Sequence, residues 1–334
     1  MDTVAVIGSN SFSGADFVDL LIDTGRYRVL GVSRSPEKAP LFLRYRQRPA
    51  SELGAFEFHQ ADLNHDMGKL FALLERERPR YIVNFAAQSE VAPSWEHPEQ
   101  WARTNVAAVA ELANFLRRQD WLEHYVHISS PEVYGTTEGF VPEDAPLNPS
   151  TPYAASKAGG DLMLGTFVQN FELPVTLIRA TNVYGAHQQL FKIIPRSVIY
   201  LKLGRTIELH GGGRAVKSYI EIRDVSRGEL AAMEAGAGRA GGVLHLSPDD
   251  GVEVREVVRT ICDRMGKDFE SSTAVVEERL GQDKAYTIDS SRARERLGWA
   301  PEVSLEQGIG QVVDWVDRYW DEIQREPLEY LHKP

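Results

Sequence analysis

Short runs of aliphatic and β-branched residues alternate along the first half of this chain with segments whose apolar residues recur at helical spacing. The predicted strands occupy residues 4–7, 27–32, 56–59, 81–86, 125–128 and 174–179. The predicted helices lie between them, at residues 17–22, 70–74, 106–116 and 153–171. Strands and helices that alternate in this way form a parallel sheet with helices on both faces. The pattern therefore predicts an α/β fold built on a doubly wound parallel sheet.

The alternation ends near residue 185, and the rest of the chain mixes glycine-rich turns with short strands and helices. This change predicts a smaller C-terminal lobe that is interleaved with the sheet. We expect the sheet domain to span residues 1–185, with returning segments near 215–240 and 287–292, and the discontinuous lobe to take most of residues 186–334. Ligands of open α/β sheets bind at the carboxyl ends of the strands, so a lobe over that edge would form a cleft.

The charge balance excludes one class of partner. The 334 residues include 37 lysines and arginines against 48 aspartates and glutamates, a net charge of −11, whereas nucleic acid needs a basic footprint.

No apolar run approaches the roughly 20 residues that span a bilayer, and the N-terminus lacks the features of a signal peptide. The single Cys262 cannot form an intrachain disulfide. We expect a cytoplasmic protein with no nucleic-acid or membrane partner.

A glycine-containing loop follows the first predicted strand and leads into the first predicted helix. Gly8 lets the chain turn sharply off the strand, and Gly14 lets the helix pack closely on the sheet. The start of this helix offers N–H groups and a positive dipole to a pyrophosphate. Ser11 replaces the usual middle glycine, so the loop alone also fits a plain strand-to-helix turn. The predicted dinucleotide contacts come from Gly8, Asn10, Ser11, Phe12, Ser13 and Gly14.

The end of the second strand indicates which dinucleotide is preferred. Dinucleotide sites for NAD carry an acid there, which binds the ribose 2′-hydroxyl. This chain has Ser33 and Arg34 and no acid, and a guanidinium suits a 2′-phosphate. The residues favour NADP over NAD, unless Arg34 stacks on the adenine or points into solvent. Asp62 and Leu63, at the end of the third strand, are predicted to lie near the adenine.

The strongest local signal is the pair Tyr153 and Lys157, which share one helix face at a spacing of four residues. A nearby ammonium lowers the pKa of a phenol, so Tyr153 is predicted to act as a base toward a sugar hydroxyl. Lys157 is also predicted to bind the nicotinamide ribose. Ser130 follows a strand upstream and is placed to donate to the oxygen that Tyr153 deprotonates.

These motifs resemble the extended short-chain dehydrogenase/reductase superfamily over essentially the whole chain, and within it the nucleotide-sugar 4,6-dehydratases of the dTDP-glucose and GDP-mannose type. The matching segments are residues 84–89, 104–106, 153–157, 179–185, 219–225 and 297–301. The resemblance implies a Rossmann-type sheet domain with a smaller substrate-binding lobe. It also implies tightly bound NADP or NAD, a nucleotide-diphosphate sugar as substrate, and a homodimer formed by the helices near residues 106–116 and 153–171.

The same resemblance implies a three-stage reaction that returns the cofactor unchanged. Tyr153 takes the proton of the sugar 4-hydroxyl while the cofactor takes the hydride from C4. Glu132 then removes the C5 proton, water leaves from C6, and the hydride returns to C6. A simple 4-epimerase needs no carboxylate at this place, so Glu132 favours a dehydratase. The alternative is that Glu132 is a solvated acid or a helix N-terminal charge.

One residue departs from the family pattern. The dTDP-glucose dehydratases have an aspartic acid before this glutamate, which protonates the leaving hydroxyl, and this chain has Pro131. We therefore expect Glu132 to remove the C5 proton and deliver it to the departing C6 oxygen, with help from Ser130 or a water. The alternative is that Pro131 marks a different reaction.

Further binding residues are implied by the resemblance alone. Phe85, Ala86 and Ala87 are expected beside the cofactor, and Gln88 and Ser89 beside the sugar. The substrate diphosphate is expected to contact Asn182, Lys217 and Arg279, where a plain surface role is the alternative for each cation.

Other functions stay open beside the dehydratase. The same fold supports 4-epimerases and uronate decarboxylases, and the decarboxylases also carry a glutamate at the place of Glu132. A nucleotide sensor without catalysis is less consistent with a complete set of Ser130, Tyr153 and Lys157. The nine histidines show no metal-ligand spacing, so no catalytic metal is expected.

Overall fold

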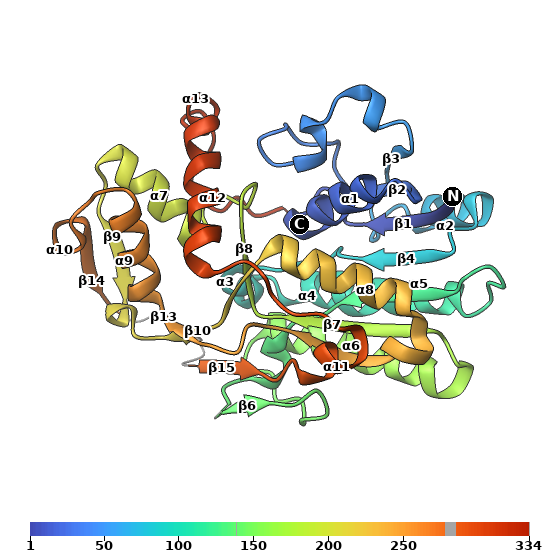
Figure 1. Ribbon diagram of the computed structural model, residues 1–334. Helices are drawn as coiled ribbons and strands as arrows, with labels where there is room; N and C mark the ends of the chain where they lie inside the picture. Colours follow the sequence, from blue (N-terminus) through green and yellow to red (C-terminus); the bar gives the residue numbers. More distant parts are fainter. Residues whose placement is uncertain (138, 278–284, 334) are drawn as a thin grey trace.

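A parallel seven-stranded sheet runs through the computed structural model (Figure 1), which describes residues 1–137, 139–277 and 285–333. The strand order is β12-β7-β5-β4-β1-β2-β3, and all neighbours are parallel. The strands are β1 (Asp2–Ile7), β2 (Tyr27–Ser33), β3 (Phe56–Gln60), β4 (Tyr81–Asn84), β5 (His124–Ile128), β7 (Val175–Ala180) and β12 (Gly242–Leu246). The predicted doubly wound sheet is confirmed, and β12 extends it with a strand from the second half of the chain.

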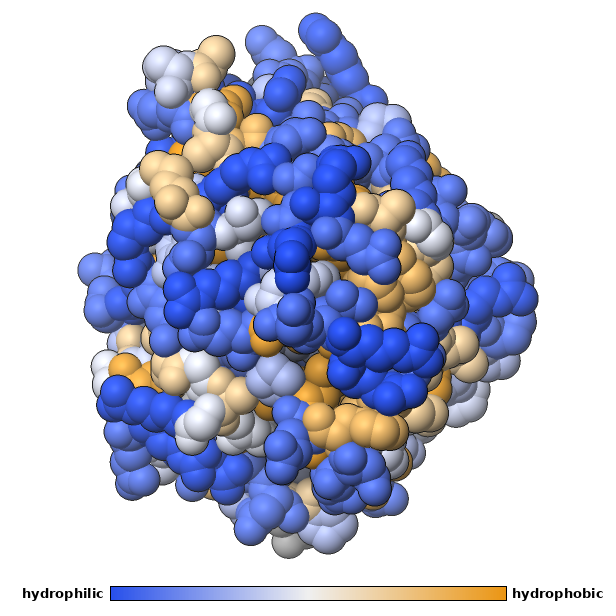
Figure 2. All heavy atoms as spheres, turned by 90° about the vertical axis from the view of Figure 1, so that its right-hand side faces the viewer, coloured by the Kyte–Doolittle hydropathy of each residue, from blue (hydrophilic) through white to orange (hydrophobic). Residues whose placement is uncertain are grey.

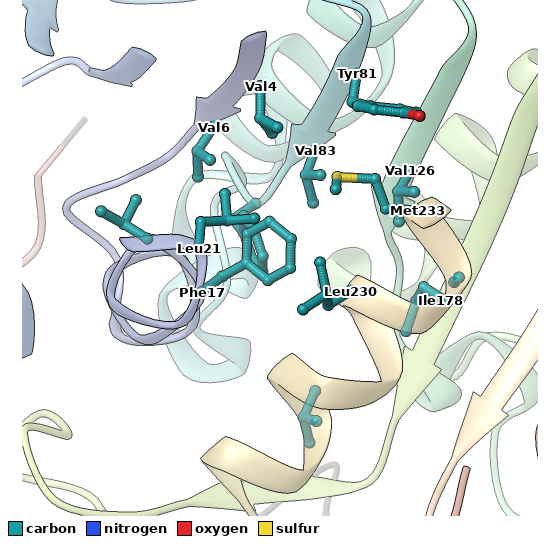
Figure 3. Packing of buried hydrophobic residues seen from close by; sticks show 14 of the residues in the cluster. Val4, Val6, Phe17, Leu21, Tyr81, Val83, Val126, Ile178, Leu230 and Met233 are labelled. Carbon is teal, nitrogen blue, oxygen red and sulfur yellow. The ribbon is translucent and has the colours of Figure 1, made fainter. Parts of the chain in front are cut away.

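Helices cover both faces of this sheet because successive side chains of each strand point to opposite sides. On β1, Val4 and Val6 belong to one core cluster, and Ala5 and Ile7 belong to another. Figure 3 shows the first cluster, where strand valines pack against α1 and α8. The helices of this face are α1 (Phe12–Thr24) and α8 (Ile222–Ala240), and those of the other face are α2 (Met67–Glu77), α5 (Ala108–Leu116) and α6 (Pro152–Phe171).

A third core lies outside the main sheet. Its buried side chains come mainly from three helices, α7 (Ile193–Leu203), α9 (Val254–Arg264) and α12 (Leu305–Arg318). The two-stranded sheet of β9 (Ile207–His210) and β14 (Thr273–Val276) packs with them. In Figure 1 these elements stand at the left, on the side toward which β1 points.

Short elements connect the two parts. The remaining strands are β6 (Phe140–Val141), β8 (Asn182–Tyr184), β10 (Val216–Lys217), β11 (Tyr219–Glu221), β13 (Val252–Glu253) and β15 (Ala285–Ile288). The remaining helices are η1 (Arg44–Gln47), η2 (Ala50–Glu52), α3 (Val91–Glu96), α4 (Pro98–Ala102), η3 (Arg103–Ala107), η4 (Pro131–Tyr134), η5 (Gly211–Gly213), α10 (Phe269–Ser272), α11 (Ser291–Leu297) and α13 (Trp320–Ile323).

The strand order reverses between β1 and β4, and this reversal sets the place of the site. From β1 the chain proceeds through β2 and β3 to one edge, and from β4 it proceeds to the other edge. Open α/β sheets bind ligands in the crevice at such a reversal. Gly8 stands there with a φ of +89°, and a Cβ on it would lie 2.6 Å from the backbone nitrogen of Ala86. Only glycine fits between the two strand ends.

The face of the molecule at the amino end of β1 is mainly hydrophilic. Figure 2 shows that hydrophilic side chains cover most of it and that hydrophobic ones form separate patches. Within the described ranges, no helix combines the length and the apolar character that crossing a membrane requires.

Candidate active site

A cavity of about 300 Å³ opens at the carboxyl ends of the strands, where the sequence predicts a dinucleotide. Ligand pockets typically hold about 300–1,000 Å³. Most of the predicted cofactor residues line it: Gly8, Asn10, Ser11, Ser33, Arg34, Asp62, Leu63, Phe85, Ala86 and Ala87. Phe12, Ser13 and Gly14, which form the first turn of α1, are not among the lining residues, and neither are Tyr153 and Lys157. Gln88 and Ser89, which were expected beside the sugar, line this cavity too.

Hydrogen bonds hold the loop before α1 in a shape that suits a pyrophosphate. The Ser11 hydroxyl accepts from the Gly14 N–H at 3.0 Å and caps the helix. The Asn10 side chain donates to the carbonyls of Ser35 and Pro36, at 2.9 and 2.8 Å. These bonds tie the helix start to the end of β2, beside the cavity that an anion would enter. The residues therefore fit a dinucleotide, and Ser11 works here as a cap.

Three cations gather at the β2 end of the cavity. Arg34, Lys38 and Lys333 all line it, and the Arg34 guanidinium donates to the Lys333 carbonyl at 3.1 Å. Burial lowers the pKa of Lys38, and the positive charges of Lys333 and Arg34 lower it further. A phosphate between these groups would relieve their mutual repulsion. Sequence reasoning found Arg34 and missed the other two, because neither lies in a recognisable motif.

Tyr153 and Lys157 lie one turn apart near the start of α6, and both side chains are buried. The helix begins here because the Thr151 hydroxyl accepts from the Ala154 N–H at 3.1 Å. Ser130 hydrogen-bonds to the Tyr153 side chain, and the Lys157 ammonium donates to the Ile128 carbonyl at 2.7 Å. The structure thus brings Ser130, Tyr153 and Lys157 together at the end of β5, as the sequence predicts.

The pKa of Tyr153 differs from the sequence expectation. Burial raises it, the Glu132 carboxylate raises it further, and the hydrogen bond with Ser130 lowers it in part. The expected lowering by Lys157 is wrong for this structure, since burial outweighs every favourable contact. Burial also lowers the pKa of Lys157 from 10.5 to about 8, although Asp161 opposes this change.

A buried ion pair holds this part of α6 against the sheet. Asp161, one turn beyond Lys157, accepts from the Arg179 guanidinium at 2.7 Å, and both side chains are buried. The Ser129 hydroxyl donates to the same carboxylate oxygen at 2.7 Å. Arg179 also contacts the Tyr134 hydroxyl and ring. Removing one member of such a pair leaves an uncompensated buried charge, so the pair fixes α6 relative to β5 and β7.

Comparison with known proteins identifies the family. The sequence matches the family GDP-mannose 4,6 dehydratase over residues 6–312. The chain belongs to this family. It is 33% identical over 262 residues to a dTDP-glucose 4,6-dehydratase of Xanthomonas campestris pv. campestris, across 73% of this chain and 74% of the relative. The resemblance to an extended short-chain dehydrogenase/reductase of the nucleotide-sugar 4,6-dehydratase type is confirmed.

Solved structures agree with this assignment. DesIV, a dTDP-glucose 4,6-dehydratase from Streptomyces venezuelae determined with NAD bound, is 30% identical and superposes with a TM-score of 0.87, covering 98% of this chain and 100% of DesIV. A UDP-glucose 4-epimerase from Thermotoga maritima is 25% identical with a TM-score of 0.85, covering 95% and 99%. The chain is an NAD(P)-dependent enzyme, and its fold is shared by dehydratases and epimerases.

Pro131 and Glu132 follow Ser130, just beyond the end of β5. They begin the short helix η4, where Ser130 accepts from the Glu132 N–H at 3.3 Å. Pro131 takes the first helical position, which needs no N–H donor, and it is buried. Pro131 thus shapes the turn, and Glu132 is the carboxylate next to Tyr153 whose charge raises the Tyr153 pKa most.

A second cavity, of about 290 Å³, lies between the sheet and the third core. Asn182 and Lys217 line it, as the sequence predicts for substrate groups, and Lys192 and Arg196 add two cations that the sequence did not indicate. Lys192 forms an ion pair with Glu90 at 2.8 Å. Glu90 and Phe191 line both cavities, so the two adjoin. Arg279 lies outside the described residues.

Replacing Lys157 with methionine tests the electrostatics of the site. Between about pH 8 and 10.5 the unfolded chain binds more protons at this lysine than the folded chain does, so its burial cost falls as the pH rises. We expect Lys157→Met to be more stable than the parent at pH 7 by on the order of 2 kcal/mol and to lose activity. Urea unfolding at pH 7 and 10 would measure this difference; an advantage that does not shrink at pH 10 would contradict it.

Proposed function

We propose that this enzyme converts a nucleotide-diphosphate hexose to the 4-keto-6-deoxy sugar by C4 oxidation, loss of water across C5 and C6, and return of hydride to C6. The observation that carries this proposal is a carboxylate, Glu132, close enough to raise the pKa of the buried base Tyr153. A 4-epimerase has no use for a second base there. We assign the two adjoining cavities, which share Glu90 and Phe191, to the two ligands that such a reaction needs.

Each residue has a defined task in the first step. Tyr153 takes the proton of the 4-hydroxyl, and Ser130 shares that hydrogen bond. Lys157, whose ammonium donates to the Ile128 carbonyl, would hold the nicotinamide ribose. When bound, NADP or NAD would supply the hydride acceptor, and its positive charge would favour the deprotonated form of Tyr153.

The elimination step falls to one residue. The side chain of Pro131 carries no proton, so Glu132 takes the C5 proton and returns it to the C6 oxygen as water leaves. A 4-keto group acidifies the neighbouring C5–H, so a carboxylate is a strong enough base for this step. The substrate diphosphate is neutralised in the second cavity by Lys217, with Lys192, Arg196 and Asn182 around it. Arg279 stays a predicted partner of this diphosphate.

Glu132→Gln tests the division between oxidation and elimination. The variant keeps the shape of the side chain and loses the base, so we expect the loss of water to fall by at least about a thousandfold, a factor within the range of general-base catalysis. C4 oxidation should remain visible as absorbance of the reduced nicotinamide. Glu111→Gln, an exposed carboxylate on α5, is the matched control.

Mass spectrometry of products from a panel of nucleotide sugars separates the alternatives. Loss of one water supports the dehydratase, and loss of carbon dioxide would show a decarboxylase instead. A product of unchanged mass with altered stereochemistry would show an epimerase. An unchanged rate of water loss in Glu132→Gln would reject the assigned role of that residue.

We propose that NADP is preferred over NAD. The end of β2 carries no acid, and the cations Arg34, Lys38 and Lys333 line the cavity there. We expect Arg34→Ala to weaken NADP binding by about 10- to 100-fold, the value of a charge-assisted hydrogen bond, and NAD binding much less. Titration calorimetry with both dinucleotides measures this, with Arg46→Ala as the control. Equal losses for NAD and NADP would contradict the preference.

We also propose a homodimer formed by α5 and α6. Leu162 and Phe171, both on α6, are 63% and 51% exposed, although large apolar side chains favour burial. Leu162→Glu would place a charge in that interface and is expected to give monomers in light scattering. Glu123→Gln, an exposed site directly before β5, should leave the mass unchanged. A parent protein that is monomeric at micromolar concentration would refute this arrangement.

A further inference from the structure

Residues 329–333 leave the third core after α13 and cross to the carboxyl edge of the main sheet. In Figure 1 the C mark stands beside the start of α1, far from α13. Tyr330, Leu331 and Lys333 line the same cavity as the loop residues Gly8 and Ser11. A segment some 300 positions away along the chain thus forms one wall of the dinucleotide cavity.

One carbonyl oxygen joins the two sides of this cavity. The Lys333 carbonyl accepts from the Gln88 amide at 2.9 Å and from the Arg34 guanidinium at 3.1 Å. Gln88 follows β4 and Arg34 follows β2, and these strands flank β1 on opposite sides. The segment therefore spans the opening between them. This bond also explains why Gln88 faces the cofactor cavity.

Ring contacts of His332 and Tyr330, and a hydrogen bond of His332, hold the rest of the segment in place. The His332 ring lies nearly parallel to the rings of His97 and Trp101, with centroids 5.2 and 5.6 Å away, and its Nε2 meets the Gln100 side-chain oxygen at 2.8 Å. Tyr330 packs edge-on against Phe191 with centroids 5.4 Å apart. His332 is thus anchored to α4, and Tyr330 to a residue that lines both cavities.

The cavity keeps a volume of about 300 Å³ beneath this segment, so the segment covers the space and does not fill it. Leu331 lines the cavity and is 62% exposed, an apolar surface that a bound ligand ring would cover. Lys333 lines the cavity together with Arg34 and Lys38, and its charge acts on Lys38, so a ligand phosphate would find three cations there.

We propose that residues 329–333 form a strap that closes over the bound dinucleotide and slows its release. The proposal rests on the proposed function, in which the cofactor is regenerated in every cycle. The bound cofactor therefore need not be exchanged for free cofactor between cycles. Slow release then keeps each enzyme molecule active without free cofactor. The strap acts through the carbonyl of Lys333 and the ring of His332, and the Lys333 ammonium adds attraction for a phosphate.

The test is the dissociation rate of NADPH and NADH from the purified full chain and from variants, followed by ligand fluorescence after a chase with excess oxidised dinucleotide. A variant that stops at residue 328 should release both at least about tenfold faster, with little change in association, as is usual for lost contacts. The dissociation rates of His332→Ala should lie between those of the parent and those of the shortened variant. Lys333→Ala keeps the carbonyl and should speed release of NADPH only.

Controls separate this effect from a folding defect. Glu322→Ala, an exposed position on α13, should release both dinucleotides at the parent rate, and circular dichroism should show the shortened variant folded at the assay temperature. An unchanged dissociation rate in the shortened variant overturns the proposed strap. Tighter binding by that variant also overturns it, because the segment would then obstruct the dinucleotide site. A parent chain that binds neither dinucleotide would overturn the proposed function itself, and is seen before any variant is made.

Discussion

The close approach of Gly8 to the backbone of Ala86 is the constraint on which the site depends. At this point the ends of β1 and β4 are near enough for the Phe85 N–H to donate to the Ile7 carbonyl at 2.7 Å. A side chain on Gly8 would push the strands apart. The crevice between the two halves of the sheet, the start of α1 and the dinucleotide cavity all follow from this contact, because each is built on the ends of these strands.

Burial governs the chemistry of the neighbouring groups. A dry site strengthens every electrostatic contact, but it also disfavours the two charged forms that the proposed reaction would use, the phenolate of Tyr153 and the ammonium of Lys157. The charges of Asp161 and Arg179 neutralise each other, and this ion pair holds α6 in place against the sheet. The protein holds its reactive groups in place and leaves their final charge state to the ligands.

Much of this architecture could be predicted from the residues. Alternating periodicity located six strands of the main sheet to within a few positions, and the spacing of Tyr153 and Lys157 placed both correctly on one helix. β12 escaped notice because its apolar run is short and follows a glycine-rich turn, so its membership depends on pairing with β7. Lys192 and Arg196 lie on or just before an ordinary helix, α7, and no local pattern separates them from surface cations.

The fold class and the family could be recognised from the residues, which also suggested the groups of the proposed reaction, because all of these depend on local spacing: a period of two or 3.6 residues, a glycine at a sharp turn, a tyrosine and a lysine on one helix face. The tertiary structure alone decided the pKa of Tyr153, the partner of Gln88 and the place of Lys333 over the cavity. Burial and contact between distant segments set these properties, and the local sequence of one segment does not indicate which distant segment it will contact.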